Sequence, residues 1–337
     1  MTIFVEKYAS VAGAGSHDGS SAANAWTIAE ATASVAAGNR VNCLAGTYIA
    51  NDSGSSAVMD LDIVGTSGAW IEWRAYTTTI GDFVPGTAQP VVLNAGTNSL
   101  TNAVIATTIP SAAYNRFIGF GFTGASSHGF NGGTTVDTAS FVGCKFNNNG
   151  GRGLAADNEF TFFLCEFTAN TTNALDADNN LTIDGCKIHN ENIATGVITT
   201  ATNFTIINCL SYNNSNGVQY RFPGNGIFEG NTLDGDGGGS SIGVQMSGGS
   251  NRFVQLANNI FFDLNVGVDF ATSGIETVSV GGFNLFSNCN TDYDNNPNDP
   301  TDISNSIDPF EDSANRDYTL ATGSAAIGAG ADAGNIV

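Results

Sequence analysis

Carboxylate pairs are the residues of this chain that are best placed to act on a sugar. Asp176 and Asp178 are two residues apart in a run typical of a β-strand, so their side chains would share one face, about 7 Å apart. Glycoside hydrolysis uses two carboxylates separated by about 5 to 9 Å. The alternative interpretation of this pair is a solvated polar strand face without catalysis.

Three later runs repeat this arrangement of polar residues beside apolar ones. In GVQYR, GVQMS and GVDF the two kinds of residue alternate, which predicts half-buried strands with one polar side. On that predicted outward side we expect Gln219, Arg221 and Gln245 to contact a glycan. If the protein is an enzyme, the catalytic candidates are Asp176, Asp178, Arg221 and Asp269.

Two loops hold acidic residues at a spacing that calcium favours. LDGDGGGSS contains Asp234 and Asp236 beside glycines, and TDYDNNPND contains Asp292 and Asp294 in an alternating run of oxygen-bearing residues. Calcium binds through carboxylate and carbonyl oxygens in loops of this kind. The second run lacks the glycine and glutamate of an EF-hand, so ordinary turns are the alternative for both. No other metal or cofactor is expected.

Four of the six cysteines, Cys144, Cys165, Cys186 and Cys209, lie inside short apolar runs. A zinc site would need two cysteines a few residues apart, and no two here are closer than 21 residues. Side chains stacked in parallel seldom reach the torsion of a disulfide. We therefore predict reduced thiols packed in a core, because cysteine is small and often buried.

The same cysteines mark an internal repeat. Its anchor residues follow one another at intervals of 21 to 27 residues: Phe120, Cys144, Cys165, Cys186, Cys209, Asn231, Asn258 and Phe283. Each interval contains two or three short apolar runs separated by Asn, Gly and Asp turns. This period predicts a parallel β-helix, in which equivalent residues of successive coils stack about 4.8 Å apart. The four thiols would then form one inward column.

Asparagines follow the anchor strand in most repeats, where the chain must turn sharply. Asparagine tolerates left-handed backbone angles and can bond to the backbone or to an asparagine of the next coil. We predict that such ladders satisfy amides that a buried turn would leave unpaired. The asparagines concerned are Asn147, Asn148, Asn149, Asn170, Asn190, Asn213, Asn214 and Asn288.

The two ends of the chain differ from the repeat. NAWTIAEATASVAAGNRV places Trp26, Ile28, Thr32 and Val35 near one face of a short helix, which predicts a cap on the first coil. We predict one structural domain in three parts. These are the first strand, helix and coil in residues 1–50, further coils in 51–290, and a C-terminal loop and capping tail in 291–337.

The formal charge of −21 limits the partners that this chain can have. It would repel nucleic acid, and it would repel acidic glycans unless a local basic patch or a bound cation reverses the sign. No run approaches the roughly 18 apolar residues of a membrane span. Glu6 and Lys7 interrupt the apolar stretch that an export signal would need, so no signal peptide is expected.

Both ends resemble one known superfamily. VEKYASVAGAGSHDGSSAANAWTIAEATASVAAGNRVNCLAGTY is similar to the first segment of right-handed parallel β-helix proteins of the pectate-lyase-like superfamily, and DPFEDSANRDYTLATGSAAIGAG resembles their closing segment. The resemblance implies an all-β, right-handed parallel β-helix with a short N-terminal capping helix and an irregular C-terminal tail. That superfamily includes polysaccharide lyases, glycoside hydrolases, epimerases and phage tailspikes. The Gly-His-Gly and Arg-Ile-Lys motifs of its polygalacturonases do not occur here.

The composition, rich in Gly, Asn, Ala and Thr, is more similar to that of a phage structural protein than to that of a secreted lyase. The resemblance therefore implies a virion surface protein (fibre, spike or capsid decoration) made in the host cytoplasm, a rigid rod that could also bind host glycans. A homotrimer in contact with other virion proteins is expected. Two alternatives stay open: a polysaccharide lyase or glycoside hydrolase, extracellular if processed, that acts on an acidic or neutral polysaccharide, and a glycan-binding module without catalysis.

Overall fold

The computed structural model describes most of the chain and divides it into two compact units, residues 1–180 and 181–337. The described residues are 4–49, 56–61, 63, 65–105, 114–133, 138–156, 159–177, 180–191, 195–199, 203–214, 217–222, 224–236, 239–247, 253–270, 280–295 and 300–328. Among them no helix is long and apolar enough to cross a membrane.

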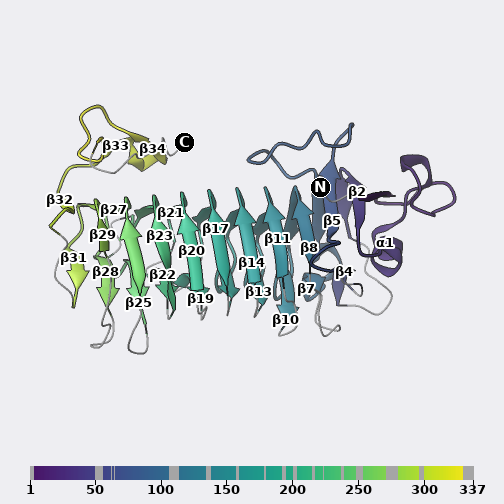
Figure 1. Ribbon diagram of the computed structural model, residues 1–337, viewed down its shortest axis with the longest axis horizontal. Coiled ribbons are helices and arrows are strands. Elements are labelled where there is room, and N and C mark those ends of the chain that lie inside the picture. Colours follow the sequence, from purple (N-terminus) through teal and green to yellow (C-terminus); the bar gives the residue numbers. More distant parts are fainter. Residues whose placement is uncertain are drawn as a thin grey trace. The chain divides into compact units, whose positions relative to one another are not determined.

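In the first unit each coil adds one strand to each of three parallel sheets (Figure 1). Sheet A has the strands β1 Val5–Ala9, β2 Asn39–Leu44, β5 Ile71–Tyr76, β8 Asn115–Ile118, β11 Thr138–Val142 and β14 Glu159–Phe163. Sheet B has β3 Gly46–Tyr48, β6 Val91–Asn94, β9 Phe120–Thr123, β12 Lys145–Asn147 and β15 Glu166–Thr168. Sheet C has β4 Ala57–Asp60, β7 Asn102–Ile105, β10 Phe130–Gly133, β13 Leu154–Ala156 and β16 Leu175–Ala177.

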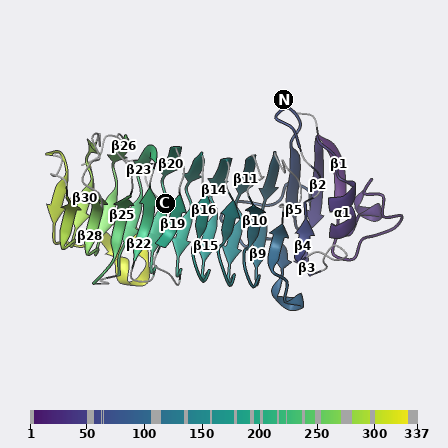
Figure 2. The same ribbon diagram turned by 90° about the horizontal axis from the view of Figure 1, so that it is seen from below.

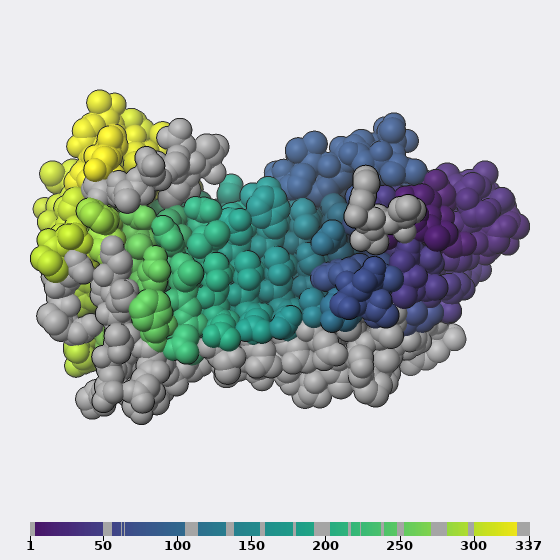
Figure 3. Space-filling model, viewed as in Figure 1, coloured from purple at the N-terminus to yellow at the C-terminus, as the bar shows by residue number. Residues whose placement is uncertain are grey.

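The second unit repeats this arrangement. Its sheet A strands are β17 Leu181–Asp184, β20 Asn203–Ile207, β23 Asn225–Glu229, β26 Val254–Ala257 and β29 Val280–Gly282. Its sheet B strands are β18 Lys187–His189, β21 Leu210–Tyr212, β24 Thr232–Asp234, β27 Ile260–Phe262, β30 Leu285–Ser287 and β32 Ile303–Asn305. Its sheet C strands are β19 Thr195–Thr199, β22 Val218–Phe222, β25 Ile242–Met246, β28 Val266–Phe270 and β31 Thr291–Asp294. Within each unit the successive coils appear as closely packed rows (Figure 3).

One residue with positive φ forms the corner between sheet A and sheet B in most coils. It is glycine or asparagine at most of these places, because these residues adopt left-handed angles at the lowest cost. The residue after the corner turns inward and stacks on its equivalent in the next coil. The corner residues are Gly119, Gly143 and Leu164 in the first unit and Gly185, Asn208, Gly230, Asn258 and Phe283 in the second.

The inward residues of this corner include the four cysteines. Cys144, Cys165, Cys186 and Cys209 are at most 2% exposed and none of them forms a disulfide, which confirms the prediction of reduced core cysteines. Burial raises the pKa of Cys144 well above its usual value, and the neighbouring Cys165 thiol adds to the effect. The Cys144 thiol therefore stays protonated at neutral pH.

In the second unit the cysteine column continues as an asparagine column. The backbone N–H of Cys209 donates to Oδ1 of Asn231, and the backbone N–H groups of Asn231 and Asn259 donate likewise to Asn259 and Asn284. The predicted anchors Asn258 and Phe283 are therefore wrong by one residue, since both are the left-handed corner itself. The cause is that coil length varies, so the spacing alone leaves the register open.

A predicted ladder also forms in the first unit. Asn149 donates a side-chain hydrogen bond to Oδ1 of Asn170 at 2.9 Å, and both side chains are almost fully buried. Their amides also donate to the carbonyl oxygens of Phe122 and Phe146. Asn148, Asn190, Asn213 and Asn288 have positive φ, as expected of turn asparagines.

Aromatic side chains stack along the interior of the first unit. The Phe117 ring lies 5.5 Å from Phe141, which lies 5.1 Å from Phe162, with the rings parallel to within 9°. A second column, Phe122, Phe146 and Phe167, has ring spacings of 4.7 and 4.8 Å. Each ring belongs to a successive coil, so the coil spacing fixes the stacking distance.

A short helix covers the first coil. The helix α1 Ile28–Ser34 begins with a capping box between Thr27 and Glu30. Ile28 and Thr32 on the helix, and Trp26 and Val35 beside it, are buried, as predicted. Short 3-10 turns lie at Ala22–Asn24 (η1) and Gly96–Asn98 (η2) in the same unit.

In the second unit β33 Phe310–Asp312, the turn η3 Ser313–Asn315 and β34 Asp317–Leu320 form an antiparallel hairpin. Phe310 packs with Ile260, Phe262 and Leu285 of sheet B and shields them from water. The predicted boundaries at residues 50 and 290 stay a prediction.

Candidate functional site

Three of the polar residues predicted to face outward lie in one row on sheet C of the second unit. Arg221, Gln245 and Asp269 occupy paired positions of β22, β25 and β28, which lie next to one another in Figure 2. The Arg221 Nε donates to Gln245 Oε1 at 2.8 Å, and the Gln245 Nε2 donates to Asp269 Oδ2 at 2.8 Å. We call these three residues, with Asp294 of β31, the Arg221 row.

The row ends in two carboxylates on adjacent strands. Asp269 is paired in register with Asp294, and parallel strands in register are about 4.8 Å apart. Asp269 is 9% exposed, whereas Asp294 is exposed. The row thus presents a guanidinium, an amide and two carboxylates in line, a mixture of hydrogen-bond donors and acceptors.

Gln219 does not share the outward face with Arg221, and that part of the prediction is wrong. Its side chain is 3% exposed, and its Nε2 donates to the backbone carbonyl of Asp234 at 2.8 Å. The strict alternation assumed along β22 fails at its first residues, where Val218, Gln219 and Tyr220 are all buried. Gln219 thus links sheet C to sheet B through a buried hydrogen bond.

The carboxylate pair predicted in the first unit is described only in part. Asp176, on β16, forms an ion pair with Arg152, with 2.9 Å between Oδ2 and Nη2. Asp178 lies outside the described residues. The Asp176 carboxylate therefore already has a cationic partner, and its catalytic role stays a prediction.

The predicted calcium ligands Asp234 and Asp236 contact the C-terminal hairpin. Tyr318 donates its hydroxyl to Asp234 Oδ2 at 2.7 Å, and Arg316 contacts both carboxylates. Asp234 is 2% exposed; burial raises the pKa of its carboxyl, while the Asp236 N–H and the Tyr318 hydroxyl oppose that rise. An arginine occupies the place where a cation would neutralise these two aspartates.

The second predicted calcium loop offers fewer described ligands. Asp292 and Asp294 lie on β31, and the Ser304 hydroxyl donates to Asp292. Asn296 and Asn298 are outside the described residues. Within the described part of the chain, no three His, Cys, Asp or Glu side chains are grouped to hold a metal ion. Calcium binding stays a proposal for both loops.

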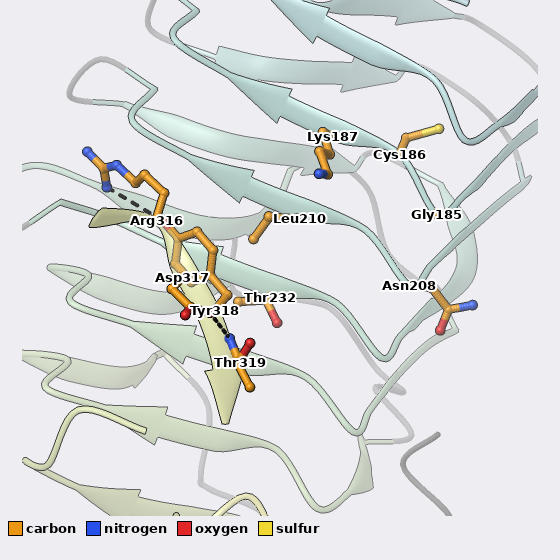
Figure 4. A pocket seen from close by; sticks show the side chains of 10 residues that line it. All are labelled: Gly185, Cys186, Lys187, Asn208, Leu210, Thr232, Arg316, Asp317, Tyr318 and Thr319. Carbon is orange, nitrogen blue, oxygen red and sulfur yellow. Dashed lines mark hydrogen bonds between the residues drawn. The ribbon is translucent and has the colours of Figure 1, made fainter. Parts of the chain in front are cut away.

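A pocket of about 240 Å³ opens where the hairpin meets sheet B of the second unit. Figure 4 shows Lys187 and Leu210 on strands of the sheet and Arg316, Asp317, Tyr318 and Thr319 on the hairpin. Lys187 is exposed and forms no ion pair with any described residue. No pattern in the sequence indicated this pocket, because the hairpin is far along the chain from β18.

Comparisons with solved structures identify the fold. The chain is 18% identical to the pectate lyase Pel9A, with a TM-score of 0.60 over 88% of this chain and 79% of that one. It has the parallel β-helix fold of pectate lyases. No family model and no curated protein sequence matches the chain.

Two further structures share this fold. A mannuronic acid specific polysaccharide family 6 lyase from human gut microbiota matches with a TM-score of 0.53 and 11% identity, over 92% of this chain and 83% of its own. The complex of XylC with xylose matches with a TM-score of 0.52 and 9% identity, over 90% and 87%. At these identities the likeness concerns the right-handed parallel β-helix alone, and it confirms the fold class predicted from the sequence.

Proposed function

We propose that this protein binds a polysaccharide along the Arg221 row. The observation that carries the proposal is the in-register, hydrogen-bonded alignment of Arg221, Gln245 and Asp269. Among the described residues these bonds leave the two terminal nitrogens of Arg221 and one oxygen of Asp269 unused. Sugar hydroxyls both donate and accept hydrogen bonds, so a line of donors followed by acceptors suits them.

The structural neighbours support this choice of ligand class. Three proteins with the same fold are a pectate lyase, a mannuronic acid specific polysaccharide lyase and XylC, whose structure is a complex with xylose. A parallel β-helix repeats its surface groups at the coil spacing, which suits an extended polymer.

Affinity electrophoresis against polygalacturonate, alginate and xylan tests the proposal. We expect at least one polysaccharide to retard the protein, and Arg221→Gln to reduce that retardation. Lys145→Gln removes one positive charge from the other unit, where Lys145 pairs with Glu166, and serves as the control. Equal retardation of Arg221→Gln and the parent protein would remove the Arg221 row from consideration.

A hydrolase is the second candidate, and the pairing of Asp269 with Asp294 favours it. Two carboxylates about 5 Å apart are the arrangement of a retaining glycosidase. If the row cleaves its ligand, Asp269→Asn and Asp294→Asn should each abolish the release of new reducing ends. A parent protein that binds a polysaccharide and releases neither reducing ends nor unsaturated uronates is a binding module.

The setting that we propose for this binding is a virion surface. It is supported by the phage-like composition of the sequence, and it implies a homotrimer in contact with other virion proteins. Immunogold labelling of purified particles with an antibody to this chain tests the location. Label confined to the soluble fraction of the host lysate would count against it.

A further inference from the structure

Three arginines surround one buried glutamate on sheet A of the first unit. Glu72, on β5, has a side chain only 3% exposed. Its carboxylate lies 2.6 Å from Arg40 Nε, 2.9 Å from Arg74 Nη2 and 3.7 Å from Arg116 Nη1. Arg40 and Arg116 come from β2 and β8, the strands on either side of β5 in Figure 1. We call these four residues the Glu72 cluster.

The cluster has more positive than negative charge. Glu6 contributes a second carboxylate, 2.9 Å from Arg40 Nη1, so three guanidinium groups share two carboxylates. This surplus is notable in a chain with 31 acidic and only ten basic residues. Because the charge of the whole chain repels anions, a local surplus of this kind is what an anionic ligand requires.

The guanidinium of Arg116 has unused hydrogen-bond donors. This guanidinium forms no hydrogen bond with any described residue, the 3.7 Å from its Nη1 to Glu72 is beyond hydrogen-bond length, and its Nε is buried without a partner. The side chain is 41% exposed and its guanidinium lies 5.2 Å from the ring centre of Trp70. Trp70 in turn packs edge-on against Tyr114 at 5.5 Å.

We propose that the Glu72 cluster is a second saccharide site, specific for a sugar that carries an oxyanion such as a carboxylate. Arg116, with Arg74 beside it, would hold the oxyanion through the planar fork of its guanidinium. Trp70 would pack against the sugar ring, as amphipathic aromatic rings do at binding surfaces. The inference depends on the proposed function only in taking the ligand to be a glycan; the residues, sheet and unit are different.

Titration calorimetry with oligogalacturonate tests this site at low ionic strength. The measurement is made in the Arg221→Gln background, so that the Arg221 row contributes little. We expect Arg116→Gln to weaken binding roughly tenfold or more, the usual loss when a charge-assisted hydrogen bond is removed. Added salt should weaken the binding as well. Lys145→Gln, with the same change of charge on sheet B of the same unit, should bind like its parent.

Each other outcome counts against the inference. If Arg116→Gln binds oligogalacturonate as tightly as its parent, the cluster only stabilises the fold. If the parent protein binds xylan and no acidic saccharide, the Glu72 cluster fails as a site while the Arg221 row stands. Should Arg116→Gln lower the thermal midpoint markedly, Arg74→Gln is measured in its place, and unchanged binding there overturns the proposal.

Discussion

At the scale of single residues, buried asparagines replace the missing backbone partners at the corners of the coils. Asn259 is 1% exposed, donates to the carbonyl of Phe228 and to Asn284, and accepts from Asn231. No apolar side chain could make these bonds, which explains why the asparagines sit among core residues. Cysteine fills the same location in earlier coils, where its Sγ contacts the equivalent backbone carbonyl, as Cys144 does with Phe117 and Cys209 with Ile183.

Replacing Asn259 with alanine should therefore destabilise the second unit. It leaves the Phe228 carbonyl and the Asn231 amide without their partner, and each buried unsatisfied group costs about 1–3 kcal/mol. Urea unfolding measures the loss. Asn290, an exposed residue whose side chain donates to Asn265, provides the matched control, and its alanine variant should unfold nearly as the parent does. Equal losses of stability in both variants would show that the buried ladder contributes no more than an exposed hydrogen bond does.

His128 makes stability depend on pH in the first unit. Burial, and then the charge of Arg152, hold the pKa of this imidazole below its usual 6.5, and the ring Nδ1 accepts the Arg152 backbone N–H. The folded state favours the neutral ring. As the pH falls through 6.5, the His128 imidazole binds a proton in the unfolded chain but not yet in the folded chain. The free energy of unfolding therefore falls.

His128→Asn should remove this contribution. Measured between about pH 5 and 8, the free energy of unfolding of the variant should fall less steeply towards acid than that of the parent. Parallel curves would mean that the His128 proton is not linked to folding.

At the scale of elements, the stacked rings of the first unit hold neighbouring coils together. Two adjacent residues of β14 allow a direct test, because Phe162 is fully buried and Phe163 is 42% exposed. Phe162 stacks on Phe141 of β11, with which it is paired in register. Side chains of adjacent residues in a strand point to opposite faces, so the two positions share their backbone but not their surroundings.

Phe162→Ala should cost about 3–5 kcal/mol, the usual loss when a buried phenylalanine leaves a cavity. Phe163→Ala should change stability by no more than about 0.5 kcal/mol. Chemical denaturation of both variants measures the difference. Similar values for the two would mean that the ring columns are not the main support of this unit.

At the scale of the whole molecule, the mass of the protein in solution tests the predicted homotrimer. Sedimentation equilibrium should give three times the 34.7 kDa of one chain. A net charge of −21 makes like chains repel, so we expect the trimer to be favoured by added salt. A single species of 34.7 kDa at every protein concentration would exclude the trimer.

The sequence by itself determined the repeat, the burial of the cysteines and the capping helix. These follow from local signals: alternation with period two, turn residues at regular intervals, and the apolar face that includes Trp26, Ile28 and Val35. It also placed Arg221, Gln245 and Asp269 on one side of their strands. Each of these features depends on residues close in sequence, so a one-dimensional pattern contains them.

Only the tertiary structure decided which distant side chains meet. Arg40 and Glu72 are 32 residues apart, and Arg316 and Asp234 are 82 apart, yet each pair is in contact. Coil lengths vary, so the register of one coil on the next depends on how the interior side chains pack. Burial of Gln219 shows the same point, because its side chain bonds to the carbonyl of Asp234 on β24, 15 residues further along the chain. Contacts of this kind arise from the stacking of coils, and the stacking is fixed by the whole interior rather than by any local pattern.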